Sequence, residues 1–186
     1  KTISSSFVMI TNTPEFGDNG VFVYSDGGVI PNPTALQLAD IAISSAEKAR
    51  LTAGIKEPKV AFLSFSTKGS ADGESVTKVR EAIEILKDRN VDFDFDGEMQ
   101  LDAAIVPEVA AIKAPGSKVA GYANVLIFPD LNSGNIGYKL TQRLAKAKAL
   151  GPLIQGLASP VHDLSRGCSV NDIVEVVAIT AVESSQ

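Results

Sequence analysis

The residue types best suited to bind an anion lie in a short polar stretch near the end of the chain, residues 160–172. It reads Pro-Val-His-Asp-Leu-Ser-Arg-Gly-Cys-Ser-Val-Asn-Asp and leads into the largely apolar residues 173–182. A loop with Ser165, Arg166 and Gly167 that runs into a helix start offers backbone N–H groups, the positive end of a helix dipole and a guanidinium. Together these groups predict a phosphate-binding site.

The same stretch also fits a purely structural role. Ser169 and Asp172 have the spacing of a capping box, in which each side chain accepts a hydrogen bond from the other residue's backbone N–H. On this interpretation Asp172 only begins a helix, and short motifs often occur without a function. The spacing alone leaves both interpretations open.

Two residues of this stretch occur once in the chain. His162 is the single histidine, and a lone histidine is weak evidence for catalysis, so we expect it to have a structural or surface role. Cys168 is the single cysteine, which excludes an intrachain disulfide and any zinc-ligand spacing of cysteines. We therefore predict no metal site and a reduced, cytoplasmic setting.

Composition describes an ordinary globular chain. Its 186 residues are 45% hydrophobic and 21% charged, which is enough to bury one substantial core. The net charge of −5 and the absence of clustered Lys and Arg argue against a nucleic-acid partner. No apolar run has the length of a spanning helix, so we expect no membrane insertion.

Apolar periodicity predicts strands that alternate with helices. We expect strands at residues 2–10, 21–24, 60–65, 92–98, 125–128 and 153–157. Helices are expected from Thr34 to Gly54, from Ser75 through Leu86, over residues 101–112 with an interruption at Pro107, over residues 136–150, and from Val170 onward. This order predicts an α/β fold with a three-layer, mostly parallel sheet and an antiparallel hairpin formed by the first two strands.

Two further stretches bear on function. Residues 92–98 alternate Asp with Phe, and this period of two favours a half-exposed strand over a cage for a metal ion. Residues 129–135 form a predicted loop at the carboxyl end of a buried strand, where α/β sheets bind ligands. That loop makes substrate-binding candidates of Asn132, Ser133 and Gly134. Neither a G-x-G-x-x-G fingerprint nor a P-loop is present, so nucleotide hydrolysis is unsupported.

Five motifs in one order resemble a known family. They are residues 24–33 (Tyr-Ser-Asp-Gly-Gly-Val-Ile-Pro-Asn-Pro), 64–70 (Ser-Phe-Ser-Thr-Lys-Gly-Ser), 124–139 (Asn-Val-Leu-Ile-Phe-Pro-Asp-Leu-Asn-Ser-Gly-Asn-Ile-Gly-Tyr-Lys), 151–156 (Gly-Pro-Leu-Ile-Gln-Gly) and 160–172. The chain resembles the C-terminal half of the phosphate acetyl/butyryltransferase family, in particular phosphate acetyltransferase (phosphotransacetylase).

The resemblance implies a reaction and roles for the site residues. It implies acetyl transfer between coenzyme A and inorganic phosphate, which interconverts acetyl-CoA and acetyl phosphate without a metal, a covalent acyl-enzyme or a cofactor other than coenzyme A as substrate. Asp172 would accept the thiol proton, Ser165 would hydrogen-bond the carbonyl oxygen, and Arg166 would hold the phosphate. Gly167 and Cys168 would line the site, Cys168 as a small buried thiol.

The resemblance also implies a domain organisation. The family has an isocitrate/isopropylmalate dehydrogenase-like fold. Residues 1–158 would be its second α/β domain, and residues 159–186 would return to an N-terminal domain that has no counterpart before Lys1. We therefore expect a homodimer, little turnover by the 186 residues alone, and a C-terminal helix that docks in a substitute arrangement or is unusually mobile.

Two points and two alternatives qualify this assignment. The family usually has Asn where this chain has His162, and Asp172 at a helix N-terminus has a lowered pKa that makes it a weaker base. One alternative is a non-catalytic module for assembly or acyl-CoA sensing. The other is a phosphate butyryltransferase, which shares the chemistry but accepts longer acyl groups.

Overall fold

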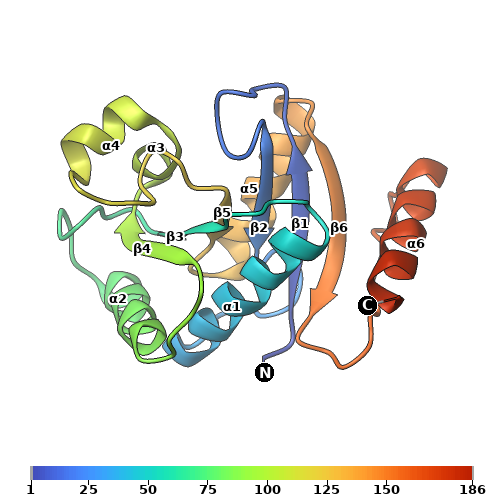
Figure 1. Ribbon diagram of the computed structural model, residues 1–186, viewed down its shortest axis with the longest axis horizontal. Helices are drawn as coiled ribbons and strands as arrows, with labels where there is room; N and C mark the ends of the chain where they lie inside the picture. The colour runs from blue at the N-terminus through green and yellow to red at the C-terminus, as the bar shows by residue number, and fades with distance from the viewer. Residues whose placement is uncertain (1, 186) are drawn as a thin grey trace.

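One six-stranded sheet forms the centre of the computed structural model, which describes residues 2–185 (Figure 1). Its strands, in chain order, are β1 Ser4–Ile10, β2 Val21–Ser25, β3 Lys59–Leu63, β4 Asp94–Met99, β5 Val125–Ile127 and β6 Lys148–Gln155. Their order across the sheet is β4-β3-β5-β2-β1-β6.

Strand β1 runs against both of its neighbours. It pairs antiparallel with β2, with Val8 opposite Val23, and antiparallel with β6 on its other side. The pairs β2–β5, β5–β3 and β3–β4 are parallel. The prediction of a mostly parallel sheet with an antiparallel hairpin at one side is confirmed.

Helices cover both faces of the sheet. Helices α1 Ala35–Leu51 and α2 Glu74–Lys87 pack on one face, and α3 Leu101–Ile105, α4 Pro107–Lys113 and α5 Leu131–Leu144 pack on the other (Figure 1). Helix α6 Val170–Ser184 lies outside these layers, beside the edge strand β6. The break between α3 and α4 falls at Pro107, as the sequence predicts.

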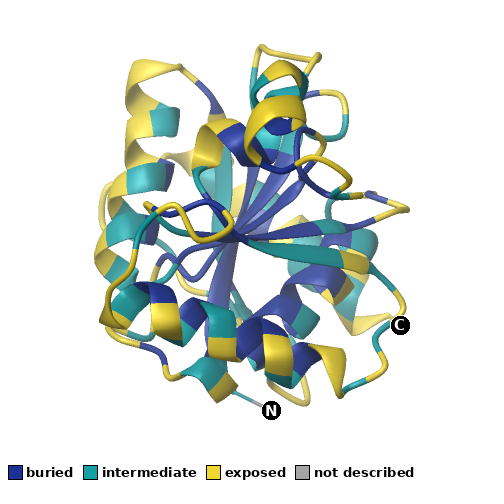
Figure 2. Ribbon diagram, turned by 90° about the vertical axis from the view of Figure 1, so that its left-hand side faces the viewer, coloured by how far each residue is buried: buried dark blue, intermediate teal, exposed yellow. Residues whose placement is uncertain are grey.

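The core has one half on each face. Val23 of β2 faces α1, and its neighbour Tyr24 faces α5, so successive residues alternate between the two halves. Figure 2 shows the buried strands between helices whose outer faces are exposed. Strand β5 is apolar throughout, and β2 and β3 are largely apolar, because both faces of these strands are covered.

Capping residues fix several helix starts. Thr34 forms a capping box with Gln37 at the start of α1, where the sequence predicts that a helix begins. The side chain of Asp130 accepts a hydrogen bond of 2.8 Å from the backbone N–H of Ser133 and so begins α5 at Leu131. The predicted loop over residues 129–135 is therefore too long.

The helix after this cap begins and ends earlier than the predicted helix over residues 136–150, and the last strand also lies earlier than predicted. Helix α5 ends at Leu144, and Lys146 adopts a left-handed backbone with φ of 53°. Lys148 then pairs with Ile10 of β1, and β6 ends at Gln155. Pairing with a strand at the opposite end of the sequence overrides the helical period that residues 145–150 share with α5.

Strand β4 departs from the predicted half-exposed strand at one position. Its period of two is present, and Phe93 and Phe95 pack partly buried on the side of α1 and α2. Glu98, however, is only 3% exposed, because Arg80 and the loop after β3 cover it.

Among the described residues, no helix is both long and apolar enough to cross a bilayer.

Candidate functional site

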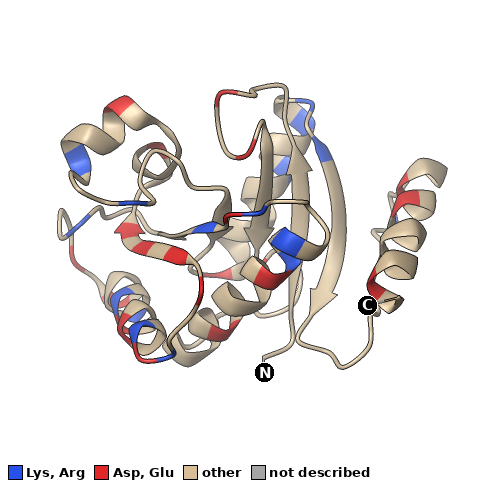
Figure 3. Ribbon diagram, viewed as in Figure 1, with Lys and Arg blue, Asp and Glu red and all other residues tan. Residues whose placement is uncertain are grey.

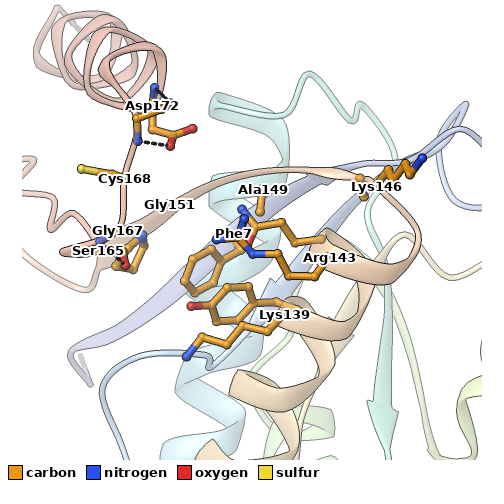
Figure 4. Close-up of a pocket in the computed structure, with 15 residues that line it drawn as sticks. Phe7, Lys139, Arg143, Lys146, Ala149, Gly151, Ser165, Gly167, Cys168 and Asp172 are labelled. Carbon is orange, nitrogen blue, oxygen red and sulfur yellow. Dashed lines mark hydrogen bonds between the residues drawn. The ribbon is translucent and has the colours of Figure 1, made fainter.

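A pocket of about 660 Å³ opens between α5, β6 and the segment that precedes α6 (Figure 4). Strand β6 contributes its middle residues, α5 its second half, and the C-terminal segment its Ser-x-Gly-Cys-Ser sequence and the first turn of α6. The residues that line it are Phe7, Tyr138, Lys139, Gln142, Arg143, Lys146, Ala147, Ala149, Gly151, Pro152, Ser165, Gly167, Cys168, Ser169 and Asp172.

The apolar part of the pocket is built on two stacked rings. Phe7 of β1 and Tyr138 of α5 lie with ring centroids 3.8 Å apart and planes inclined by 17°. Burial raises the pKa of Tyr138, so its hydroxyl stays protonated at neutral pH. Gly151 passes close to β1, where a Cβ atom would lie 2.8 Å from the carbonyl oxygen of Ser6.

The basic side of the pocket comes from α5 and the turn that follows it. Lys139 and Arg143 are four residues apart and so lie on one face of the helix, and Lys146 follows. Lys139 Nζ donates to Asn135 Oδ1 at 2.8 Å and lies 5.6 Å from the centroid of the Tyr138 ring. In Figure 4 Lys146 points away from residues 165–172. The segment across the pocket leads into helix α6, which carries only acidic charges (Figure 3).

The segment opposite these cations is organised by its own hydrogen bonds. The backbone N–H of Cys168 donates to the carbonyl of Ser165 at 3.0 Å, and that of Gly167 donates to Ser165 Oγ at 3.2 Å. Ser169 N–H donates to Asp172 Oδ2 at 2.7 Å, and Asp172 N–H donates to Ser169 Oγ at 3.2 Å. The predicted capping box is therefore present, and it sets Asp172 at the rim of the pocket (Figure 4).

This arrangement keeps Asp172 ionised. Hydrogen bonds from Ser169 hold the pKa of the Asp172 carboxyl below its usual value, and the charges of Lys148 and Arg143 lower it further. A carboxylate in this state accepts hydrogen bonds readily but is a weak base.

The predicted site residues are only partly brought together. Ser165, Gly167, Cys168 and Asp172 line the pocket, whereas Arg166 is exposed beside it and is not part of its lining. The basic residues of the pocket were missed from the sequence, although the spacing of Lys139 and Arg143, four residues apart in a predicted helix, was a readable signal.

Asn132, Ser133 and Gly134 lie elsewhere, in the first turn of α5. Ser133 Oγ donates to the Asp130 carbonyl at 2.8 Å. A Cβ atom on Gly134 would lie 2.0 Å from the carbonyl oxygen of Asp26, so glycine allows α5 to approach the chain after β2. Substrate binding by these three residues stays a prediction.

His162 lies inside the protein, away from the pocket lining. Its side chain is 1% exposed, and its Nδ1 accepts a hydrogen bond of 3.2 Å from the backbone N–H of Ile154. Its Nε2 lies 3.2 Å from Glu183 Oε2. These contacts give His162 the structural setting expected from the sequence. The described residues contain no cluster of three or more His, Cys, Asp or Glu that could hold a metal ion.

The fold and the pocket define an α/β domain in which a C-terminal segment and the basic residues of α5 line one cavity. Residues 1–181 match the family described as phosphate acetyl/butaryl transferase, and the chain belongs to that family.

Curated relatives and solved structures agree with this assignment. The phosphate acetyltransferases of Thermoanaerobacterium thermosaccharolyticum and Clostridium acetobutylicum are 61% and 60% identical over 99% and 100% of this chain. A crystal structure of a phosphotransacetylase from Streptococcus pyogenes is 49% identical, covers 100% of this chain and superposes with a TM-score of 0.91.

These relatives are longer proteins. The chain covers 56% of each of the two curated relatives and 54% of the Streptococcus pyogenes chain. It thus spans about half the length of the proteins that it matches.

Proposed function

We propose that this chain is part of a phosphate acetyltransferase that interconverts acetyl-CoA plus phosphate with acetyl phosphate plus coenzyme A. The observation that carries the proposal is the pocket that Ser165, Cys168 and Asp172 line together with Lys139 and Arg143. Both substrates are anionic, and cations concentrated at one place offset the repulsion of a chain with a net charge of −5. The names of the relatives support the same reaction.

The transfer needs no covalent bond to the protein. In the direction of acetyl-CoA synthesis, the thiol sulfur attacks the acyl carbonyl of acetyl phosphate, a C–S bond forms, and the C–O bond to phosphate breaks. Asp172 accepts the thiol proton, and phosphate leaves as the anion. Ser165 Oγ–H donates to the oxyanion, and Arg166 offsets the charge of the phosphate.

The proton transfer sets a condition on Asp172. An ordinary thiol has a pKa of about 8.5 and an ordinary Asp about 3.9, so the transfer is uphill by roughly 6 kcal/mol. The hydrogen bonds from Ser169 increase that gap. Asp172 therefore acts as base only when the remaining part of the protein closes the pocket and removes water from the carboxylate.

The same observations bear on the alternatives. The relatives at about 60% identity are named for the acetyl reaction, which favours acetyl over butyryl transfer. A formed pocket that retains Ser165 and Asp172 favours an enzyme over a silent module. Coenzyme A enters as substrate, and we expect no other cofactor, a cytoplasmic location and a homodimer.

Acetyl phosphate formation by the full-length parent protein tests the proposal. Ser165→Ala removes the oxyanion donor, and we expect kcat to fall by about 10²- to 10³-fold.

Asp172→Asn removes the base, and we expect kcat to fall by about 10²- to 10⁴-fold. Arg143→Gln removes a charge-assisted contact, and we expect the KM for coenzyme A or phosphate to rise about tenfold.

Matched controls come from the same segment. Ser159→Ala and Asp163→Asn change an exposed hydroxyl and an exposed carboxylate outside the pocket, and we expect activity within twofold of the parent. An active parent protein whose rate is unchanged by both Ser165→Ala and Asp172→Asn would contradict the proposed roles. A parent protein that forms no acetyl phosphate at all would contradict the function.

A further inference from the structure

Helix α6 makes little apolar contact with the rest of the chain. Val176 is its one buried residue among those described, and Val170, Val174 and Val177 are at least 60% exposed. Figure 1 shows α6 beside β6, apart from the helices that cover the sheet. Its position therefore depends on a few polar contacts.

The strongest of these contacts joins the end of α6 to α1. Glu183 Oε1 accepts hydrogen bonds of 2.7 Å from Lys48 Nζ and from Thr52 Oγ1, and Glu183 Oε2 accepts one of 2.8 Å from Lys48 Nζ. The two charged side chains are only 5% and 9% exposed. An ion pair so far removed from water is strongly destabilised when one partner loses its charge.

His162 attaches the start of the same segment to β6 and also touches Glu183. It forms an isolated bridge with Leu153, and its Nδ1 accepts from Ile154 N–H. A neutral ring bonded in this way carries its proton on Nε2, which faces Glu183 Oε2 at 3.2 Å. The histidine and the carboxylate thus form one buried cluster with Lys48.

The pocket-lining residues lie in the chain between these two attachment points. Residues 165–172 hydrogen-bond to one another, through Ser165 with Gly167 and Cys168 and through Ser169 with Asp172. The attachments at His162 and Glu183 therefore hold these residues against β6 and α5.

We propose that Glu183 is a positioning residue: with Lys48 and His162 it fixes residues 165–172 over the pocket, and protonation of His162 releases them. With a neutral ring the cluster holds one positive and one negative charge. A protonated ring adds a second buried cation beside Lys48, with a single carboxylate to balance both. That release of residues 165–172 weakens coenzyme A binding rests on the proposed function. The position of these residues does not rest on it.

The pH dependence has a definite sign. The charged groups that face His162 are Glu183 of α6 and Lys48 of α1, and β6 offers it a backbone N–H. Burial lowers the pKa of His162, and Lys48 adds to the lowering, while Glu183 opposes it without reversing it. Docking is therefore strongest above the ordinary histidine pKa of about 6.5, and it weakens as the pH falls from there through the lowered pKa.

Hydrogen exchange of this chain, corrected for the intrinsic effect of pH, tests the proposal. Glu183→Gln leaves the buried Lys48 without a counter-charge, and we expect amides of residues 160–184 to exchange at least tenfold faster at pH 7.5. Glu175→Gln breaks the more exposed pair of the same helix with Lys148, and we expect less than a threefold change. Unchanged exchange in Glu183→Gln would overturn the proposal.

The histidine is tested separately with the residue that the family usually has. We expect exchange of residues 160–184 to accelerate between pH 7.5 and 5.5 in the parent chain and to stay constant in His162→Asn. Equal pH dependence in both chains would overturn the role of His162. If circular dichroism shows that Glu183→Gln does not fold, the double variant Lys48→Met/Glu183→Gln removes the unpaired ammonium. Faster exchange of residues 160–184 in this variant is then the expected result, and unchanged exchange would overturn the proposal.

Coenzyme A titration of the parent protein separates this inference from the proposed function. Fast exchange in Glu183→Gln together with no coenzyme A binding by the parent would refute the function and leave the positioning role standing. Normal coenzyme A binding with unchanged exchange in Glu183→Gln would refute the positioning role alone.

Discussion

Glu98 is a single carboxylate on which the loop after β3 depends. It accepts hydrogen bonds from Arg80 Nε at 3.1 Å, from Gly69 N–H at 2.8 Å and from Ser66 Oγ at 2.9 Å. Burial alone raises the pKa of Glu98, but these donors outweigh it and lower the pKa to about 2. One ionised side chain thus joins β4, α2 and residues 66–69.

Replacing Glu98 measures that connection. Glu98→Gln removes the charge from buried hydrogen bonds, and we expect the free energy of unfolding at pH 7 to fall by about 2 kcal/mol. Urea denaturation measures it. Glu84→Gln, in an exposed pair with Lys87, is the control and should change stability by less than about 0.5 kcal/mol.

The free energy of unfolding of the parent chain and that of Glu98→Gln should also depend differently on pH. The folded pKa of Glu98 is depressed, so its contribution is complete above the ordinary value near 4.5 and is lost as the pH falls toward about 2. The difference in the free energy of unfolding between the parent chain and Glu98→Gln should therefore become smaller as the pH falls across this range. An advantage that stays constant from pH 7 to pH 2 would contradict the assigned pKa.

At the scale of elements, the packing of α5 on the turn after β2 depends on Gly134. Gly134→Ala would gain about 1 kcal/mol in an exposed helix. Here the new methyl group would lie 2.0 Å from a backbone oxygen, so α5 must shift. We expect a net loss of about 1 to 3 kcal/mol in thermal or urea unfolding.

A second glycine of the same helix provides the comparison. A Cβ atom on Gly137 would lie 3.0 Å from the edge of the Phe128 ring, and a side chain yields more easily than backbone. Gly137→Ala should therefore cost less than about 1 kcal/mol. Equal losses in the free energy of unfolding for Gly134→Ala and Gly137→Ala would contradict the importance of the close contact between Gly134 and Asp26.

At the scale of the whole molecule, the pocket offers few cations. Lys139, Arg143 and Lys146 are its only basic lining residues among those described. Coenzyme A carries several phosphates, so we expect the 186 residues alone to turn over at less than about 1% of the rate of the full-length parent protein. Acetyl phosphate assays at equal molar concentrations compare the two, and full activity of the short chain would contradict this expectation.

Association of the whole molecule is a separate prediction. Three apolar residues on the outer side of α5 are at least 51% exposed: Ile136, Leu140 and Leu144. They leave an apolar surface on this helix. We expect a homodimer that buries on the order of 1,200 Å² or more. Sedimentation at micromolar concentrations measures the mass, and a monomer across that range would contradict the prediction.

The sequence by itself determined the features that depend on neighbouring residues. The apolar runs of residues 60–65 and 125–128 predicted buried strands, which the structure has at Lys59–Leu63 and Val125–Ile127, and the spacing of Ser169 with Asp172 predicted a capping box. These features follow from local backbone geometry and short apolar runs, so a short window of sequence suffices to find them. The motifs also determined the family, because several of them occur in one order.

The tertiary structure alone decided which surfaces meet. Local patterns did not indicate that Arg143 lines a pocket with Ser165, that Glu98 is buried under Arg80, or that Glu183 reaches Lys48. The last two residues are 135 positions apart. Such contacts depend on how the layers of the fold pack, and the burial that follows sets the charge state of each group. For this reason the basic residues of the pocket needed the fold, whereas Ser165, Gly167, Cys168 and Asp172 could be named from the sequence.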